Sequence, residues 1–186
     1  IPKTPDNLHG LLLNARFIQG IYDDAADPDR YNRFGRGPWD PDRNTEALIA
    51  ALPEWYRYGL RAFTVGFQGG GPFFTIPNNE IENNPFGPDG GRIDPRYAER
   101  MDRLIRAADE KGFVVIVSYL YQGQVDRLSE PGAVLNAVRT ASRFIRENDY
   151  ENVIIEVANE HDVGAFARHP LVSAPESAAA LISIAR

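Results

Sequence analysis

The sequence contains no cysteine, and this excludes both disulfide bonds and metal sites built on thiolates. No apolar run approaches the ~18 residues that a membrane-spanning helix needs, so we expect no association with a membrane. Lysine and arginine do not form a run that would follow a phosphate backbone, and the net charge is −6. Nucleic acid is therefore not an expected partner.

The 186 residues are 43% apolar and 25% charged, which is the composition of a globular domain with a sizeable hydrophobic core. This composition suits a secreted or periplasmic protein as well as a cytoplasmic one, so the compartment stays open.

Four segments are apolar nearly throughout, as expected for parallel strands that are covered on both faces. They span residues 11–18, 60–67, 113–121 and 152–159. Helical patterns separate and follow them, at residues 44–58, between 94 and 112, from 131 onward and from 173 to the end. Pro53 is expected to kink or split the first helix, and the spacing of Ser173 and Glu176 predicts a capping box for the last one.

This order repeats a strand–helix unit four times, which is typical of a doubly wound sheet or of a (β/α)8 barrel. No GxGxxG motif or P-loop follows the first strand, which disfavours the nucleotide-binding sheet. Long segments, residues 19–43 and 68–93, follow the first two strands, as do the loops that build the active-site face of a barrel. We therefore predict an α/β fold in which residues 1–186 form the N-terminal half of a (β/α)8 barrel. The remaining half is the expected partner, from the same gene or a second chain, and a natural half-barrel that dimerises is the alternative.

The last predicted strand, within ENVIIEVANEHD at residues 151–162, carries charged groups that are costly to bury. Because side chains alternate along a strand, Glu156 and Glu160 share one face. If that face is the barrel interior, Glu160 projects from the carboxyl end of the strand into the cleft, and Glu156 lies one layer deeper.

The run E-V-A-N-E resembles the fourth-strand signature of clan A retaining glycosidases, especially the cellulase-like family five. The resemblance implies that Glu160 is the general acid/base and that Asn159 binds the sugar 2-hydroxyl. It implies cleavage of O-glycosidic bonds in a β-linked oligo- or polysaccharide, with no cofactor. Retaining hydrolysis needs a second carboxylate about 5–5.5 Å from the first. The resemblance places that nucleophile on a seventh strand, which residues 1–186 do not contain, so this portion alone is expected to be inactive.

The sequence departs from the family pattern at three places. Thr64 or Gly66 stands where the second strand usually carries an arginine, the third strand ends in VSYLYQG without the usual histidine, and His161 replaces the proline that commonly follows the Asn-Glu pair.

Two further groups of residues are predicted to support this site. Arg16 lies on the same face of the first strand as Asn14 and Ile18, so we expect a buried ion pair between Arg16 and Glu156. Aromatic and amide side chains near the strand ends are candidate sugar-binding groups. These residues are Trp39, Gln68, Phe73, Phe74, Tyr119, Tyr121 and Gln122.

Two other functions remain open at this point. Glu160, His161 and Asp162, with His169 nearby, offer metal-ligand chemistry, but neighbouring residues of an extended strand point to opposite faces and cannot all bind one ion. The other alternative is a non-catalytic carbohydrate-binding or interaction module with a glycosidase-like barrel. It is favoured by the missing arginine and histidine.

Overall fold

The computed structural model describes residues 10–35, 37–70 and 80–186. Its centre is a single sheet of four parallel strands in the order β1-β2-β3-β4. The strands are β1 (Asn14–Arg16), β2 (Ala62–Gly66), β3 (Val114–Tyr121) and β4 (Val153–Asn159). All four predicted strands are confirmed, although β1 is much shorter than residues 11–18 because the chain pairs with β2 over three residues only.

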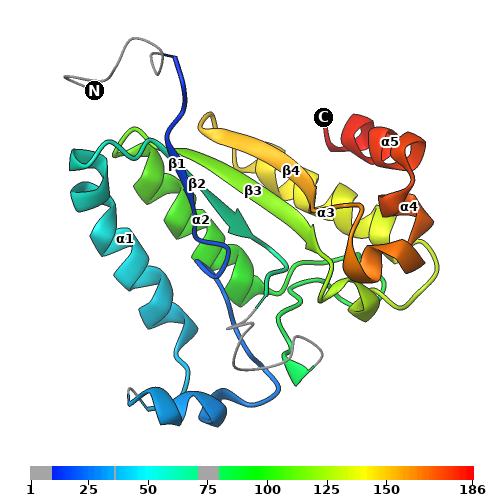
Figure 1. The fold of residues 1–186 in the computed structure, drawn as a ribbon, viewed down its shortest axis with the longest axis horizontal. Coiled ribbons are helices and arrows are strands. Elements are labelled where there is room, and N and C mark those ends of the chain that lie inside the picture. Colours follow the sequence, from blue (N-terminus) through cyan, green and yellow to red (C-terminus); the bar gives the residue numbers. More distant parts are fainter. Residues whose placement is uncertain (1–9, 36, 71–79) are drawn as a thin grey trace.

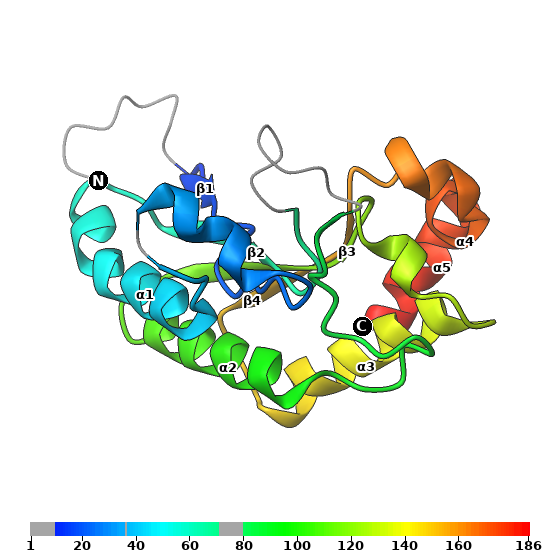
Figure 2. The same cartoon turned by 90° about the horizontal axis from the view of Figure 1, so that it is seen from below.

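A helix follows each strand. The principal helices are α1 (Pro41–Arg57), α2 (Pro95–Asp109), α3 (Ala133–Glu147) and α5 (Pro175–Ala185), with a short α4 (Pro170–Ser173) before the last. Three 3-10 helices lie in the loops after the strands: η2 (Pro28–Phe34), η4 (Val125–Arg127) and η5 (Gly164–Arg168). Figures 1 and 2 show α1, α2 and α3 side by side along one face of the sheet.

The strand order distinguishes a doubly wound sheet from a (β/α)8 barrel, which share the alternation of strands and helices. A doubly wound sheet reverses its strand order and carries helices on both faces, whereas a barrel adds each strand beside the previous one and keeps its helices outside. Here the strands follow in sequence order, and α1, α2 and α3 cover one face. The fold is therefore α/β, with the first four βα units of a (β/α)8 barrel.

Helix boundaries differ from the sequence prediction at two places. Helix α1 begins at Pro41, because the Asp40 side chain accepts a hydrogen bond from the Arg43 backbone N–H, and it continues without a break through Pro53. Pro53 is tolerated because it lies on the exposed side of the last turns. The capping box predicted at Ser173 is wrong: α5 has Ala174 as its N-cap, and the Ser173 hydroxyl donates to the backbone oxygen of His169.

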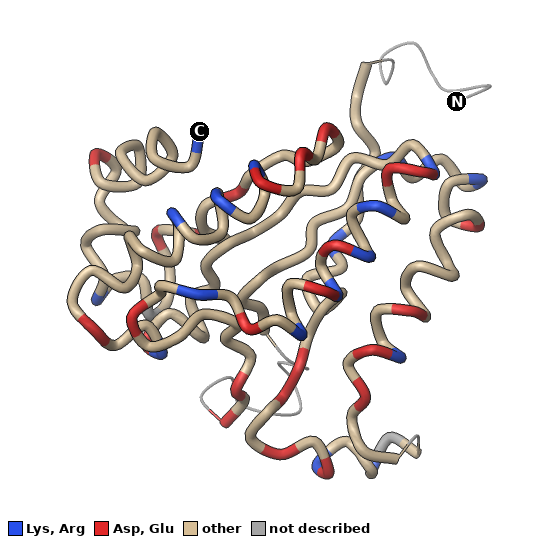
Figure 3. The backbone as a smooth tube through the Cα atoms, turned by 180° about the vertical axis from the view of Figure 1, so that it is seen from behind, with Lys and Arg blue, Asp and Glu red and all other residues tan. Residues whose placement is uncertain are grey.

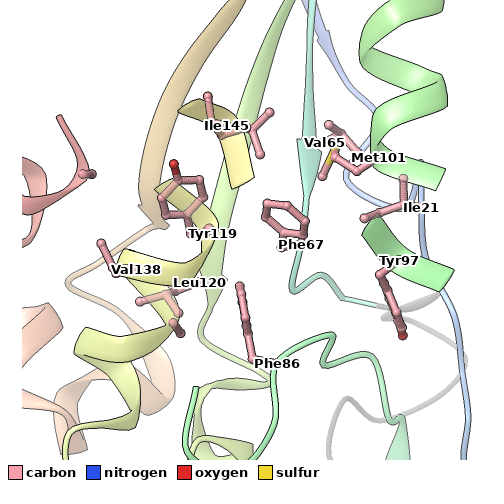
Figure 4. Packing of buried hydrophobic residues seen from close by; sticks show 14 of the residues in the cluster. Ile21, Val65, Phe67, Phe86, Tyr97, Met101, Tyr119, Leu120, Val138 and Ile145 are labelled. Carbon is pink, nitrogen blue, oxygen red and sulfur yellow. The ribbon is translucent and has the colours of Figure 1, made fainter. Parts of the chain in front are cut away.

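The core lies between the sheet and its helices. Phe67, just after β2, and Tyr119 of β3 lie beside each other in the core, with ring centroids 6.2 Å apart (Figure 4). Phe144 of α3 meets the Phe67 ring edge-on, with centroids 5.6 Å apart. The apolar face of α2 is buried in this cluster. It consists of Tyr97, Met101, Leu104, Ile105 and Ala108.

The opposite, inner face of the sheet carries Arg16, Thr64, Ile116 and Ile154 in one register row, and Gly66, Ser118 and Glu156 in the next. Ile154 is 49% exposed, in contrast to the helix-facing residues of the same sheet. Charges of both signs are interspersed along the helices and loops, while the strands carry few (Figure 3). No helix within the described ranges is long and apolar enough to cross a membrane.

Candidate active site at the carboxyl ends of the strands

The Asn-Glu pair lies where β4 ends. Asn159 is the last residue of the strand, and Glu160 is the first residue of the turn that follows. Glu160 adopts a left-handed backbone conformation with φ of 53°, which residues other than glycine rarely adopt. Its backbone oxygen accepts a hydrogen bond from the Val163 N–H, while its side chain is exposed. Among the described residues the Glu160 carboxylate has no hydrogen-bond or ion-pair partner, so it is accessible at this edge of the sheet.

Arg16 does not pair with Glu156, and this corrects the sequence prediction. The Nη2 atom of Arg16 donates instead to Oδ1 of Asn159, at 2.5 Å. Glu156 Oε2 is buried without a hydrogen-bond partner in the described parts of the chain, as is the hydroxyl of Ser118, its register neighbour on β3. Residue parity placed Arg16 and Glu156 on one face correctly, but it did not show that the longer reach of arginine extends to the end of β4.

Gln68 was predicted to contact substrate, but its side chain is fully buried. Its Nε2 donates to Asn84 Oδ1 at 2.8 Å and to the Gln124 backbone oxygen, and its Oε1 accepts from the Tyr121 backbone N–H at 3.0 Å. Gln68 therefore joins the ends of β2 and β3 to the loop beneath them. Tyr119 is also buried, because it points to the helix side of the sheet.

Tyr121 and Gln122 stay at the mouth of the sheet, where both are partly exposed. The Tyr121 ring lies so close to Gly70 that a Cβ there would be 2.8 Å from the phenol oxygen. Gln122 packs against Gly164 in the loop after β4. Their contact with substrate stays a prediction, and Phe73 and Phe74 lie outside the described residues.

Trp39 lines a cavity of about 530 Å³ between the loop after β1 and the start of α1. Tyr22 and Tyr31 form an aromatic wall with Trp39, whose indole N–H donates to the Tyr22 backbone oxygen at 3.1 Å. The rim adds polar groups from Gln19, Asp40, Arg43 and Asn44. An apolar aromatic wall with planar polar groups around it suits a ring that has both an apolar face and hydroxyl groups.

A buried polar network holds this wall in place, and the sequence reading missed it. The fully buried carboxylate of Asp24 accepts from the Tyr31 hydroxyl at 3.0 Å and pairs with Arg30 at 3.1 Å. The Tyr31 and Tyr22 hydroxyls are hydrogen-bonded to each other, and burial raises the pKa of both phenols. An aspartate within a long segment between a strand and a helix gives no local signal of burial, so the sequence alone does not indicate this network.

The neighbouring carboxylate, Asp23, is also largely buried. Desolvation raises its pKa, and the positive charge of Arg100 on α2, 3.7 Å away, opposes that shift. Arg100 is itself buried and donates through Nε to the Ile21 backbone oxygen. These groups connect the loop after β1 to α2. They do not contact Glu160.

The loop after β4 is fixed by charged contacts. Asp126 in η4 pairs with Arg168 and with His169, whose Nε2 is 2.7 Å from the carboxylate. The hydrogen bond with His169, followed by that with Arg168, lowers the pKa of Asp126. His161 and Asp162 are exposed, and no cluster of three or more potential metal-ligating side chains lies within the described ranges.

Compared with known proteins, the chain matches no family model and no curated protein sequence. Among solved structures it is similar to β-glucosidase from Thermotoga maritima in complex with methoxycarbonyl-substituted glucoimidazole, with a TM-score of 0.49, 16% identity and coverage of 86% of this chain and 38% of that one. The same enzyme in complex with castanospermine gives a TM-score of 0.43 and 17% identity, and the match covers 86% of this chain and 37% of that one.

A γ-CGTase from Alkalophilic bacillus clarkii gives a TM-score of 0.34 and 14% identity, covering 59% of this chain and 18% of that one. The chain thus spans less than two fifths of the length of each of these enzymes.

Proposed function

We propose that residues 1–186 form the N-terminal half of the catalytic barrel of a retaining glycoside hydrolase that acts on a β-linked oligo- or polysaccharide. The observation that carries this proposal is the position of Glu160: an unpaired, accessible carboxylate at the carboxyl end of β4, beside Asn159. In barrel enzymes catalytic groups stand at this end of the strands. The left-handed backbone at Glu160 adds support, because strained conformations concentrate at functional sites.

Glu160 acts in both steps of the proposed reaction. In the first, its carboxylic acid protonates the glycosidic oxygen while the nucleophilic carboxylate attacks the anomeric carbon, so that the leaving alcohol departs and a glycosyl ester forms. In the second, the Glu160 carboxylate takes a proton from water as that water attacks the anomeric carbon and releases the nucleophile. The nucleophile belongs to the other half of the barrel. That half packs against the inner face of the sheet and pairs with the free edges of β1 and β4.

Trp39 and its aromatic neighbours supply a second contact with the substrate. The segment that contains η2 and the start of α1 lies well away from the loop after β4 in both Figure 1 and Figure 2. The cavity beside Trp39 therefore binds a sugar unit at a distance from the bond that Glu160 protonates.

Deleting the Glu160 carboxylate and adding azide tests the acid/base role. In the full-length protein, Glu160→Ala is expected to lower turnover of natural glycans by about 10²–10⁴-fold. An aryl glycoside with a good leaving group needs no proton in the first step, so its glycosyl ester accumulates. Azide needs no base to attack that ester, so it restores turnover and yields a glycosyl azide of retained configuration.

Glu151→Ala is the matched control, because Glu151 is exposed just before β4, at the opposite end of the strand from Glu160. It is expected to leave turnover unchanged. Wild-type activity in Glu160→Ala would contradict the acid/base role. A full-length wild type that binds oligosaccharide without turnover would favour the carbohydrate-binding module instead.

A further inference from the structure

The hydrogen bond between Arg16 and Asn159 determines the orientation of the Asn159 amide. The two residues are 143 positions apart, on the two edge strands of the sheet. The oxygen and nitrogen of an asparagine amide are nearly identical in shape, so the hydrogen-bond partners decide which way the group points. A guanidinium group has donors only, and it therefore requires the amide oxygen.

The nitrogen of the same amide is left to donate. Nδ2 of Asn159 has no partner among the described residues, and it is not one of the fully buried unpaired atoms. The residue as a whole is 4% exposed, so its accessible surface is small and close to the chain turn that carries Glu160. Asn159 thus presents its amide NH2 group beside the acid/base, and this group selects an acceptor oxygen on the ligand.

The inner face of β2 explains why this arginine comes from β1. Thr64 is the register neighbour of Arg16, and Gly66 follows it on the same face. A Cβ at Gly66 would lie 2.2 Å from the backbone oxygen of Gln68, so no larger residue fits there. With only short side chains on β2, the long side chain of Arg16 has room to extend toward the end of β4.

We propose that Arg16 is a positioning residue: it holds the Asn159 oxygen, so that Asn159 Nδ2 donates to the 2-hydroxyl oxygen of the sugar next to the bond that is cleaved. This inference rests on the proposed function. Arg16 itself does not touch the substrate, and its effect is transmitted through the amide.

The kinetic test compares an aryl glycoside with its 2-deoxy analogue, using the full-length protein. With the parent substrate, Arg16→Met is expected to lower kcat by about 10- to 100-fold, the range for loss of one well-placed hydrogen bond. With the 2-deoxy analogue, which lacks the acceptor, the loss is expected to be less than about threefold. Asn159→Ala should show the same selectivity, and the double variant should be no worse than either single one.

Two further variants separate positioning from folding. Arg16→Lys keeps a positive donor and is expected to recover part of the lost kcat. Arg61→Met removes an arginine that donates to the backbone oxygens of Tyr56 and Leu60 before β2, so it controls for the loss of an arginine next to the sheet but away from Asn159. It should affect both substrates equally. Equal losses for both substrates in Arg16→Met, or additive losses in the double variant, would overturn the proposal.

A measurement without substrate keeps this inference distinct from the proposed function. In the ¹⁵N NMR spectrum, the side-chain NH2 resonances of Asn159 are expected to shift in Arg16→Met and to remain unchanged in Arg61→Met. Unchanged resonances in Arg16→Met would refute the contact, whatever the activity. If these resonances shift but Glu160→Ala retains full turnover, the glycosidase function fails while the Arg16–Asn159 contact stands.

Discussion

Two residues other than glycine, Asp149 and Glu160, adopt the left-handed backbone conformation in the part of the chain that the structure describes. Asp149 follows α3 at the turn into β4, a common place for this conformation, and aspartate tolerates it. Glu160 has no comparable local reason, because a long side chain gains nothing from a left-handed turn. The conformation directs this side chain out of the strand end. We infer that the energetic cost of this backbone conformation is tolerated because the position of the carboxylate is needed for function.

Replacing each of these residues by glycine separates strain from function. The left-handed conformation costs roughly 1–2 kcal/mol, and the extra chain entropy of glycine cancels part of the gain. Glu160→Gly and Asp149→Gly are each expected to raise the free energy of unfolding by up to about 1 kcal/mol, as measured by urea denaturation. Only Glu160→Gly should abolish turnover. If Glu160→Gly destabilises the protein, its backbone is not strained.

At the scale of elements, the segment between β1 and α1 forms a second small core together with Ile81 from the segment after β2. Tyr22, Tyr31, Ile81 and Trp39 form this second apolar cluster, and the ion pair between Asp24 and Arg30 closes it on one side. Because Tyr22 and Tyr31 are fixed by buried hydrogen bonds, the wall beside the cavity is preorganised. Preorganised aromatic surfaces lose little entropy when a ligand binds.

The fluorescence of Trp39 can report binding in this cavity directly. The sequence has two tryptophans, and the other, Trp55, stacks on Phe17 with ring centroids 4.4 Å apart. A Trp55→Phe variant therefore leaves Trp39 as the sole indole fluorophore. We expect oligosaccharide to shift and quench its emission in a saturable way, because a sugar ring excludes water from the indole.

Trp39→Phe in the wild-type background is the matched variant, since it keeps an aromatic ring but removes the larger indole surface. It is expected to lower the affinity for oligosaccharide, as measured by calorimetry, and to leave the turnover of a short aryl glycoside unchanged. An unaltered Trp39 emission at saturating oligosaccharide would show that the cavity does not bind sugar.

At the scale of the whole molecule, the sheet is covered by helices on one face and has two edge strands. Within the described ranges β1 and β4 each pair with one neighbouring strand, and Ile154 on the inner face of β4 is half-exposed. Unpaired strand edges and exposed apolar residues favour association with another chain. This is the surface that the other half of the barrel is proposed to cover.

A polypeptide of residues 1–186 alone is accordingly expected to self-associate in a concentration-dependent manner. Ile154→Lys should weaken that association, because it places a charge in the contact. Ile182→Lys is the matched control, since Ile182 is also 49% exposed but lies on α5. Sedimentation velocity would measure both. A monomeric wild type, or an equal effect of the two variants, would contradict the assignment of the inner face.

The sequence by itself determined the strands, the helices and their order. Each predicted strand segment is apolar nearly throughout, and helices such as α2 show apolar residues at helical spacing between a Pro start and a Gly stop, so short-range patterns were sufficient. The strand order followed, because parallel strands joined by helices are added one after another in a barrel. The position of Asn159 and Glu160 at a strand end could also be read from the chain.

Only the tertiary structure decided which polar groups meet. Arg16 binds Asn159 rather than Glu156, and Gln68 is buried under the loops, because these contacts depend on how far side chains reach across a curved sheet. The same holds for Asp24, which lies in the loop after β1 but is fully buried against the partly exposed Arg30. Periodicity fixes the face on which a residue lies, whereas its partner is fixed by the path of segments far apart in the sequence.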